Sequence, residues 1–261
     1  MLSRIKSRVL NRLERRKYAP DIEVHRTADL LRLGSGYGGW TFEPSSDLQH
    51  STVLSCGLGE DASFDVEFAS RFNAKVIIVD PTPRAILHFA EMQARIGQPA
   101  TEGYVKGGKQ PTTAYNLSAL AANALILEPS ALWVENTPLK FYAPRNPDHV
   151  SHSIVDYQND YSQHGTHIEV RAITPEALLE KYSLKTIGLM KLDIEGAEIK
   201  VIPHVLEKSI LPRQLLVEFD EMNFPSHRSK KNAEYADGLL SQAGYTCRYF
   251  DGLANFLYAL R

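Results

Sequence analysis

The sequence predicts an α/β fold built on a mostly parallel sheet. Strand-like and helix-like segments alternate through most of the 261 residues, which is the pattern of parallel strands joined by helices. The runs at 74–81, 187–193 and 214–219 are apolar almost throughout, as expected for strands covered on both faces. A C-terminal hairpin with an Asp251-Gly252 turn should add one antiparallel strand.

Strands are expected where apolar residues run continuously or alternate, and helices where amphipathic segments follow cap residues. The expected strands are the first part of a strand–turn–helix unit at 53–73, then 74–81, 168–174, 187–193, 214–219, 245–250 and 253–260. The expected helices are the second part of 53–73, then 83–96, 175–182, 198–209 and 229–243. Thr174 and Pro175 mark one helix start, because Pro is favoured at the first helical position.

The middle of the chain is less regular. Residues 116–126 are rich in Ala and Leu and predict a helix that runs into a strand. Residues 132–142 predict a β-hairpin. Residues 104–111 are rich in Gly and Lys, and residues 144–165 are polar, so both segments are expected to be loops. A loop as long as the second one is usually functional or mobile.

The composition is typical of a soluble globular protein, with 43% hydrophobic and 23% charged residues. No apolar run is long enough to predict a membrane-spanning helix, and no secretory signal pattern is present at the start. Two cysteines are too few for a disulfide framework and fit a reducing compartment. We therefore expect a cytoplasmic protein.

The first thirty residues are expected to form a basic helical extension, followed by one domain at 31–261. Residues 1–20 contain seven Lys or Arg residues against one Glu, and five aliphatic residues fall on one helical face. Such a segment either contacts a membrane surface or another anionic partner, or packs on the domain with its charges in water. The second interpretation is favoured, because five aliphatic residues without Trp or Phe make a weak anchor.

A glycine-rich turn follows the first apolar strand. Gly57-Leu-Gly-Glu-Asp-Ala62 matches the pattern G-x-G-x-x-A, and Asp80 lies 21 residues beyond Gly59 at the end of the next strand. Both features belong to the dinucleotide-binding fingerprint. Taken alone, they favour an NAD-dependent oxidoreductase.

The two acids in this turn argue against NAD. A pyrophosphate is held by free N–H groups at the helix start, and the carboxylates of Glu60 and Asp61 would compete for those groups and repel phosphate. S-adenosyl-L-methionine (SAM) carries no phosphate. Its amino-acid portion suits a close approach to glycine backbone, and Asp80 is expected to accept hydrogen bonds from both ribose hydroxyls. We therefore expect SAM as the cofactor.

Further acids are predicted at the ends of later strands. Asp193 and Glu195 end the apolar strand at 187–193, and Glu218 ends the next one. Because ligands bind at the carboxyl ends of parallel strands, these acids should face the glycine turn. They could flank a substrate hydroxyl or hold a divalent cation, and we assign no metal site. His152, in the long loop, is a candidate general base.

The segment Gly34-Ser-Gly-Tyr-Gly-Gly-Trp40 contains four glycines in six positions and fits no regular element. It precedes the strand that leads into the glycine turn. We expect it to form a wall or lid of the cofactor pocket, with Tyr37 nearest the ligand. The alternative is a flexible connector in which Trp40 packs into the core.

Several of these segments together resemble the FkbM-type family of SAM-dependent methyltransferases. The matching segments are VLSCGLGED at 53–61, VIIVDPTP at 76–83, LMKLDIEGAE at 189–198 and QLLVEF at 214–219, with further likeness at 37–40 and 149–154. The resemblance implies a Rossmann-like class I methyltransferase fold, which has a seven-stranded, mostly parallel sheet, a C-terminal antiparallel hairpin and helices on both faces. It also implies that Ala131 and Leu132 approach the adenine.

The candidate cofactor-binding residues are Tyr37, Gly57, Gly59, Glu60, Asp61, Asp80, Pro81, Ala131, Leu132 and Asp193. The candidate catalytic residues are Asp193, Glu195, Glu218 and His152. The family implies transfer of a methyl group to a hydroxyl of a small molecule, sugar or glycolipid. The alternatives are an NAD-dependent oxidoreductase and a non-catalytic SAM or nucleotide sensor. Basic and aromatic residues are not interleaved anywhere, so no nucleic-acid partner is expected.

Overall fold

The computed structural model describes residues 14–142 and 167–261. Its main element is a seven-stranded sheet of order β11-β12-β10-β9-β3-β4-β5. The strands are β3 Thr52–Cys56, β4 Lys75–Val79, β5 Leu125–Glu128, β9 Leu189–Leu192, β10 Gln214–Glu218, β11 Tyr245–Phe250 and β12 Asn255–Leu260. β12 pairs antiparallel with β10 and β11, and the remaining neighbours pair in parallel. The predicted fold class is confirmed.

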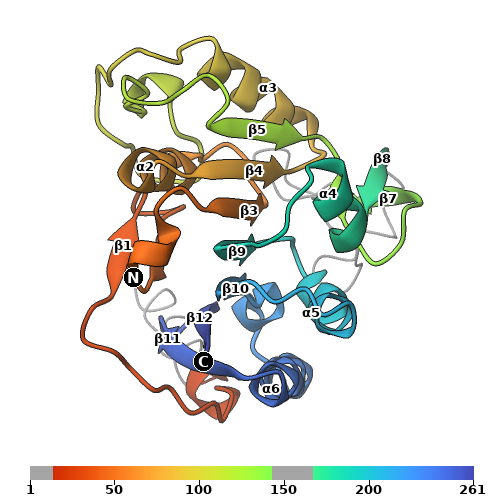
Figure 1. Ribbon diagram of the computed structural model, residues 1–261. Coiled ribbons are helices and arrows are strands. Elements are labelled where there is room, and N and C mark those ends of the chain that lie inside the picture. Colours follow the sequence, from red (N-terminus) through yellow and green to blue (C-terminus); the bar gives the residue numbers. More distant parts are fainter. Residues whose placement is uncertain (1–13, 143–166) are drawn as a thin grey trace, which may run out of the picture.

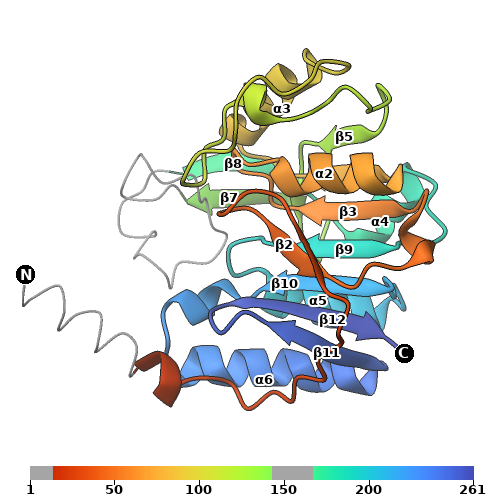
Figure 2. The ribbon, with the colours of Figure 1, turned by 90° about the vertical axis from the view of Figure 1, so that its left-hand side faces the viewer.

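Helices cover both faces of this sheet (Figure 1). They are α2 Ser63–Phe72, α3 Pro83–Gln93, α4 Pro175–Lys181, α5 Glu198–Glu207 and α6 His227–Gln242, and short 3₁₀ turns are η1 Ser46–Leu48, η2 Thr112–Ala114 and η4 Asp220–Asn223. α2 and α3 pack on one face, and α4, α5 and α6 on the other. Figure 2 shows α6 running along the part of the sheet formed by β11 and β12.

The strands supply both cores by simple alternation. Val53 of β3 and Val76 of β4 pack in the core beneath α2, whereas Leu54 and Ile77 pack in the core beneath α5. Successive side chains of a strand point to opposite faces, so an entirely apolar strand serves two cores at once. α3, α4 and α5 begin at the predicted residues, and α6 begins two residues before the predicted start, at His227. The Thr174 hydroxyl caps α4 at the N–H of Ala177, and Pro175 is the first helical residue.

The glycine-rich segment connects two short strands, β1 Leu31–Leu33 and β2 Trp40–Phe42, which pair antiparallel. The prediction that the glycines themselves form no regular element therefore holds, and the residues on either side form a small sheet. Phe42 packs against the aromatic face of α2, with its ring 5.2 Å from that of Phe68. This contact and the hydrogen bond from the Ser35 N–H to the Ser63 hydroxyl (2.7 Å) hold the segment against α2.

The predicted hairpin at 132–142 is wrong. β6 Ala131–Leu132 and β7 Pro138–Tyr142 do not pair with each other, because both pair with β8 His167–Ile173, β6 in parallel and β7 antiparallel. The three strands form a separate sheet of order β6-β8-β7. Alternation in the sequence indicates strands but does not identify their partners, and here the partner follows after a long intervening segment.

The predicted helix within 116–126 is also absent. The segment is a series of turns that leads into β5 at Leu125. Its Leu117 is buried, donates its N–H to Gln98 and accepts from Gly97. Pairing with this neighbouring segment uses the backbone groups that a helix would need, so tertiary contacts override the helix propensity of Ala and Leu.

The N-terminal segment lies along the domain where the structure describes it. Residues 14–17 are helical, and the chain is then extended. Asp21 donates its N–H to Glu234 (2.9 Å), His25 donates its N–H to Cys247 (2.9 Å), and Ile22 packs on the core beneath α5. No helix within residues 14–142 and 167–261 has the length and apolar character needed to cross a membrane.

Candidate active site

A cavity of about 1010 Å³ opens at the carboxyl ends of the central strands. β3 lies at the point where the sheet order reverses, with β4 on one side and β9 on the other. Loops leave the sheet in opposite directions there, which is the usual ligand position in such folds. Every candidate site residue within the described part of the chain lines this cavity. His152 lies outside the described residues.

The glycine turn is shaped by close contact with the loop after β9. Gly57 has φ of +90°, and a Cβ at this position would lie 1.9 Å from the carbonyl oxygen of Asp193. Only glycine fits there. Gly59 has φ of +56°, but a Cβ there would meet no atom within 4 Å. Gly57 therefore allows the glycine turn to contact the loop after β9, and Gly59 leaves open space facing the cavity.

Asp80 holds the turn from the end of β4. Its Oδ2 accepts hydrogen bonds from the N–H groups of Leu58 (2.9 Å) and Gly59 (3.0 Å). Its Oδ1 accepts from the N–H (2.8 Å) and hydroxyl (2.7 Å) of Thr82. A carboxylate has about four acceptor positions, and all four are used. The expected bonds to both ribose hydroxyls therefore require that internal bonds be replaced, and this role of Asp80 stays a prediction.

Asp61 fastens the glycine-rich segment to the start of α2. Its Oδ1 accepts from the N–H of Ser63 (3.0 Å), the first residue of α2. Its Oδ2 accepts from the Ser35 hydroxyl (2.6 Å) and the Gly38 N–H (3.2 Å). A Cβ on Gly38 would lie 2.7 Å from this carboxylate, so the segment approaches closely because it contains glycine.

The negative charge of Glu60 is balanced by two cations of the protein. Its carboxylate forms ion pairs with Arg84 (2.5 Å) and Lys109 (3.0 Å), and its side chain is 7% exposed. Lys109 belongs to the predicted loop at 104–111, which is confirmed as irregular and lies beside the glycine turn. Arg84 and Lys109 were not predicted as site residues.

These contacts decide how the turn can receive a ligand. The N–H groups of residues 57–59 and 61–63 all donate within the protein, to Val79, Asp80, Leu58, Tyr115 and Asp61. A pyrophosphate depends on such groups being free. SAM needs no phosphate cradle, and the open side of Gly59 provides space beside the turn. The cavity therefore fits SAM better than NAD.

The far end of the cavity is apolar. Ala131, Leu132 and Phe141 line it, and each is less than 9% exposed. Pro81 lines the neighbouring wall, next to Asp80. β6 brings Ala131 and Leu132 there by pairing with β8. Apolar lining is suited to a nucleobase, and adenine contact at these residues stays a prediction.

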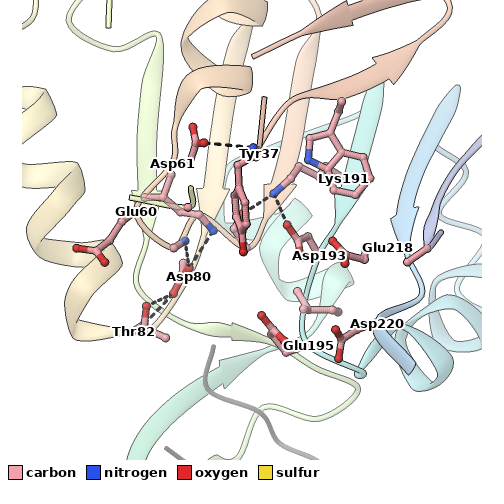
Figure 3. A pocket seen from close by; sticks show the side chains of 18 of the residues that line it. Tyr37, Glu60, Asp61, Asp80, Thr82, Lys191, Asp193, Glu195, Glu218 and Asp220 are labelled. Atoms are coloured by element: carbon pink, nitrogen blue, oxygen red, sulfur yellow. Dashed lines mark hydrogen bonds and ion pairs between the residues drawn. The ribbon is translucent and has the colours of Figure 1, made fainter. Parts of the chain in front are cut away.

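Tyr37 stands at the centre of the cavity view, between Asp80 on one side and Asp193 on the other (Figure 3). Its side chain is 70% exposed, and a Cβ on Gly108 would lie 2.6 Å from its ring. Trp40, by contrast, is 5% exposed and packs in the core beneath α2. Both residues line the cavity, and Trp40 also anchors the segment in the core; the lid role and the position of Tyr37 nearest the ligand stay predictions.

Acidic side chains gather opposite the glycine turn. Asp193 and Glu195 extend from the loop after β9, and Glu218 and Asp220 from the end of β10 (Figure 3). Burial and the nearby charge of Asp193 raise the pKa of Glu218 to about 8. Burial and the same charge raise the pKa of Asp220. Asn223 donates a hydrogen bond to Glu218 (3.0 Å).

Glu195 has φ of +55°, so it occupies the left-handed region, which is unusual for a residue other than glycine. Glu198 follows at the start of α5, is buried, and accepts from the N–H of Ile194 (2.8 Å). This bond holds the turn that carries Asp193 and Glu195. Among the described residues, no group of three or more His, Cys, Asp or Glu side chains has an arrangement suited to a metal ion.

Lys191 is a further cavity residue that was not predicted. It lies on β9 between β3 and β10, and its side chain is 6% exposed. Its ammonium group donates to the Gly57 carbonyl, lies 3.4 Å from Asp193 Oδ2 and faces the Trp40 ring at 5.5 Å. A charged residue inside an otherwise apolar strand was the available signal, since Lys is rarely buried without a partner.

The family of the chain follows from comparison with known proteins. The model of the methyltransferase FkbM domain matches residues 19–247. No curated protein matches the chain. Similar solved structures include a fibrillarin from Aeropyrum pernix in complex with natively bound SAM, with 10% identity and a TM-score of 0.40, covering 84% of this chain and 70% of that one. An rRNA methylase from Streptococcus thermophilus has 14% identity and a TM-score of 0.40, covering 83% and 92%.

The exclusion of nucleic-acid partners is corrected by these comparisons. Two rRNA methyltransferases are among the similar structures, so the lack of interleaved basic and aromatic residues is no ground for excluding such an acceptor. At this level of similarity no acceptor is assigned either. The NAD-dependent alternative is replaced, because the family model spans most of the chain, including the glycine turn and the acidic residues that follow β9 and β10. The chain therefore belongs to the FkbM family of methyltransferases and is a SAM-dependent enzyme.

Proposed function

We propose that this methyltransferase transfers the methyl group to a hydroxyl oxygen, and that Glu218 removes the hydroxyl proton. The observation that carries the proposal is the partly buried Glu218 carboxyl, which lines the cavity opposite the glycine turn and has its pKa raised to about 8. A general base works best when its pKa lies near the working pH. Most carboxylates are too weak as bases to meet this condition.

SAM supplies an activated methyl group when it is bound, so the protein needs only to align the acceptor and remove one proton. Glu195 and Asp220 lie on the same side of the cavity as Glu218 (Figure 3) and can accept hydrogen bonds from an acceptor with several hydroxyls. Asn223 donates to Glu218 and thereby orients its carboxyl group. As the acceptor oxygen gains the methyl group, the bond between that methyl group and the sulfonium sulfur would break, leaving a neutral thioether, and the hydroxyl proton would pass to Glu218. The protein would therefore accelerate the reaction mainly by positioning the two reactants, with a smaller contribution from base catalysis.

The acceptor is proposed to be a hydroxyl-bearing small molecule, sugar or glycolipid. A set of carboxylates on one wall supports this class, because carboxylates accept hydrogen bonds from neighbouring hydroxyls. The rim of the cavity also carries Phe224 and Leu253, which are 54% and 50% exposed and can contact the apolar parts of an acceptor. Nucleic acid remains among the acceptors to be tested.

The test is transfer of labelled methyl from SAM to a panel of alcohols, sugars, glycolipids and RNA, with the methylated atom identified by mass spectrometry. Glu218→Gln should lower kcat by about 10²–10⁴-fold, the usual contribution of general base catalysis, while the Kd for SAM changes less than about threefold. Glu207→Gln, on the exposed surface of α5 and outside the cavity, is the matched control and should leave kcat unchanged. Methylation of nitrogen or carbon alone, or an unchanged kcat in Glu218→Gln, would refute the proposal.

A further inference from the structure

The glycine turn leaves the anionic end of SAM without an evident partner. The methionine portion of SAM carries an ammonium group and a carboxylate, and backbone N–H groups of a glycine turn are an obvious place for the carboxylate. In this chain the N–H groups of residues 57–59 and 61–63 already donate to protein acceptors. The side-chain cations that line the cavity are therefore the better candidates for binding this carboxylate.

Four cationic side chains line the cavity within the described residues, and three of them are poor choices. Arg84 and Lys109 are paired with Glu60 at 2.5 and 3.0 Å. Lys106 is exposed, so its charge is surrounded by water and screened. An exposed or already paired cation adds little to the binding of a carboxylate.

Lys191 differs from these three in burial and in position. Its ammonium group lies between the glycine turn and the acidic wall, in contact with the Gly57 carbonyl and 3.4 Å from Asp193. Burial lowers the pKa of Lys191, but the charges of Asp193 and Asp65 raise it more, so the group stays charged. An ammonium group has three N–H donors, and a buried charge interacts more strongly than an exposed one.

The pair formed by Lys191 and Asp193 is the charge complement of a zwitterion. A cation and an anion 3.4 Å apart face the cavity side by side, as the carboxylate and ammonium groups of an amino acid do. We propose that Lys191 binds the carboxylate of SAM and that Asp193 binds its ammonium group. The inference rests on the SAM dependence of the family and is independent of the proposed acceptor.

The experiment compares SAM with decarboxylated SAM, which keeps the ammonium and sulfonium groups but lacks the carboxylate. Both are titrated calorimetrically into the wild type and into Lys191→Met, without an acceptor. The wild type should bind SAM at least about tenfold more tightly than decarboxylated SAM, since a hydrogen-bonded charge pair contributes about 1.5–3 kcal/mol. Lys191→Met should abolish that preference by weakening SAM binding about 10–100-fold, with decarboxylated SAM changed less than about threefold.

Three further variants separate binding from structural support. Lys191→Arg retains the charge and should retain the preference for SAM. Asp193→Asn should weaken both ligands to the same extent, because both carry the ammonium group. Lys109→Met removes a cavity lysine that is paired with Glu60 and should leave the preference unchanged.

Two results would overturn the inference. One is equal affinity of the wild type for the two ligands, which is decisive even if Lys191→Met fails to fold. The other is an equal loss of affinity for both ligands in a folded Lys191→Met variant. Lys191 would then only hold the glycine turn, through its bond to the Gly57 carbonyl. Neither result bears on oxygen methylation, which the acceptor panel tests separately.

Discussion

Asp80→Asn separates the two roles that the Asp80 carboxylate can have, holding the glycine turn and binding the cofactor. The wild-type carboxylate accepts from Leu58 and Gly59 through one oxygen and twice from Thr82 through the other. Asn retains one oxygen but replaces the second with an NH₂ group. Whichever way the amide turns, NH₂ faces backbone N–H donors, so at least one buried N–H loses its acceptor.

The magnitude follows from these bonds. Hydrogen bonds to a charged group contribute about 1.5–3 kcal/mol each, and the Asn variant weakens all four and breaks at least one. Because the bonds share one side chain, their losses do not add. We expect the free energy of unfolding to fall by about 2–4 kcal/mol, which lowers Tm by roughly 4–15 °C in a domain of this size. The Kd for SAM should rise about 5–100-fold, because the turn loses its fixed shape.

Urea unfolding followed by circular dichroism measures the first quantity, and calorimetric titration with SAM measures the second. Asp47→Asn is the control, because Asp47 pairs with Arg213 at 2.6 Å on the surface, with side chains 49% and 67% exposed. Exposed pairs contribute about 0–1 kcal/mol, so this variant should be almost unchanged. An Asp80→Asn protein as stable as the wild type but unable to bind SAM would refute the holding role and favour the ribose contact alone.

The remaining predictions concern the glycines, Tyr37 and two buried acids. Gly57→Ala should lose several kcal/mol of stability, or fail to fold, because its Cβ would lie 1.9 Å from a backbone oxygen. Gly59→Ala should lose only about 1–2 kcal/mol, since a Cβ there meets no atom within 4 Å. Urea unfolding of both variants measures the difference. Tyr37→Ala should raise the Kd for SAM several-fold with Tm almost unchanged, because its side chain is 70% exposed; a large fall in Tm with unaltered affinity would contradict this. Turnover should rise with pH to a plateau above about 8 as Glu218 ionises, and a flat profile would exclude Glu218 as the base. Burial raises the pKa of Asp65 from 3.8 to about 6, so the folded chain binds more protons than the unfolded chain in that window and stability falls as pH rises; Asp65→Asn should remove that part of the fall in urea titrations.

The two acids in the glycine turn show how chemistry in the sequence and geometry in the fold complement each other. Glu60 and Asp61 predicted a turn unsuited to phosphate, and the structure supports this for a partly different reason. Asp61 does take an N–H group at the start of α2, whereas Glu60 is paired with two cations. The N–H groups of Leu58 and Gly59 are taken by Asp80 instead. The sequence therefore predicted the ligand class, and the fold shows which residues exclude phosphate.

The two incorrect secondary-structure predictions share one cause. The segments at 132–142 and 116–126 have the local patterns of a hairpin and a helix, and the structure contains neither. In both segments the hydrogen bonds go to distant residues, to β8 in one and to residues 97–98 in the other. The local preference of a segment for helix or hairpin is weak, and backbone hydrogen bonds to distant residues readily override it.

The sequence by itself determined the α/β fold, the position of the glycine turn and the acids at the strand ends, because apolar periodicity and glycine spacing are local properties of a chain. It could not determine the site around Lys191. That residue looks like one charge in an apolar strand until β9 is placed beside β3, where its ammonium group meets the Gly57 carbonyl, Asp193 and the Trp40 ring. Those partners come from three separate segments. Only the tertiary structure brings them together, and a buried charge acquires its role from the groups that surround it.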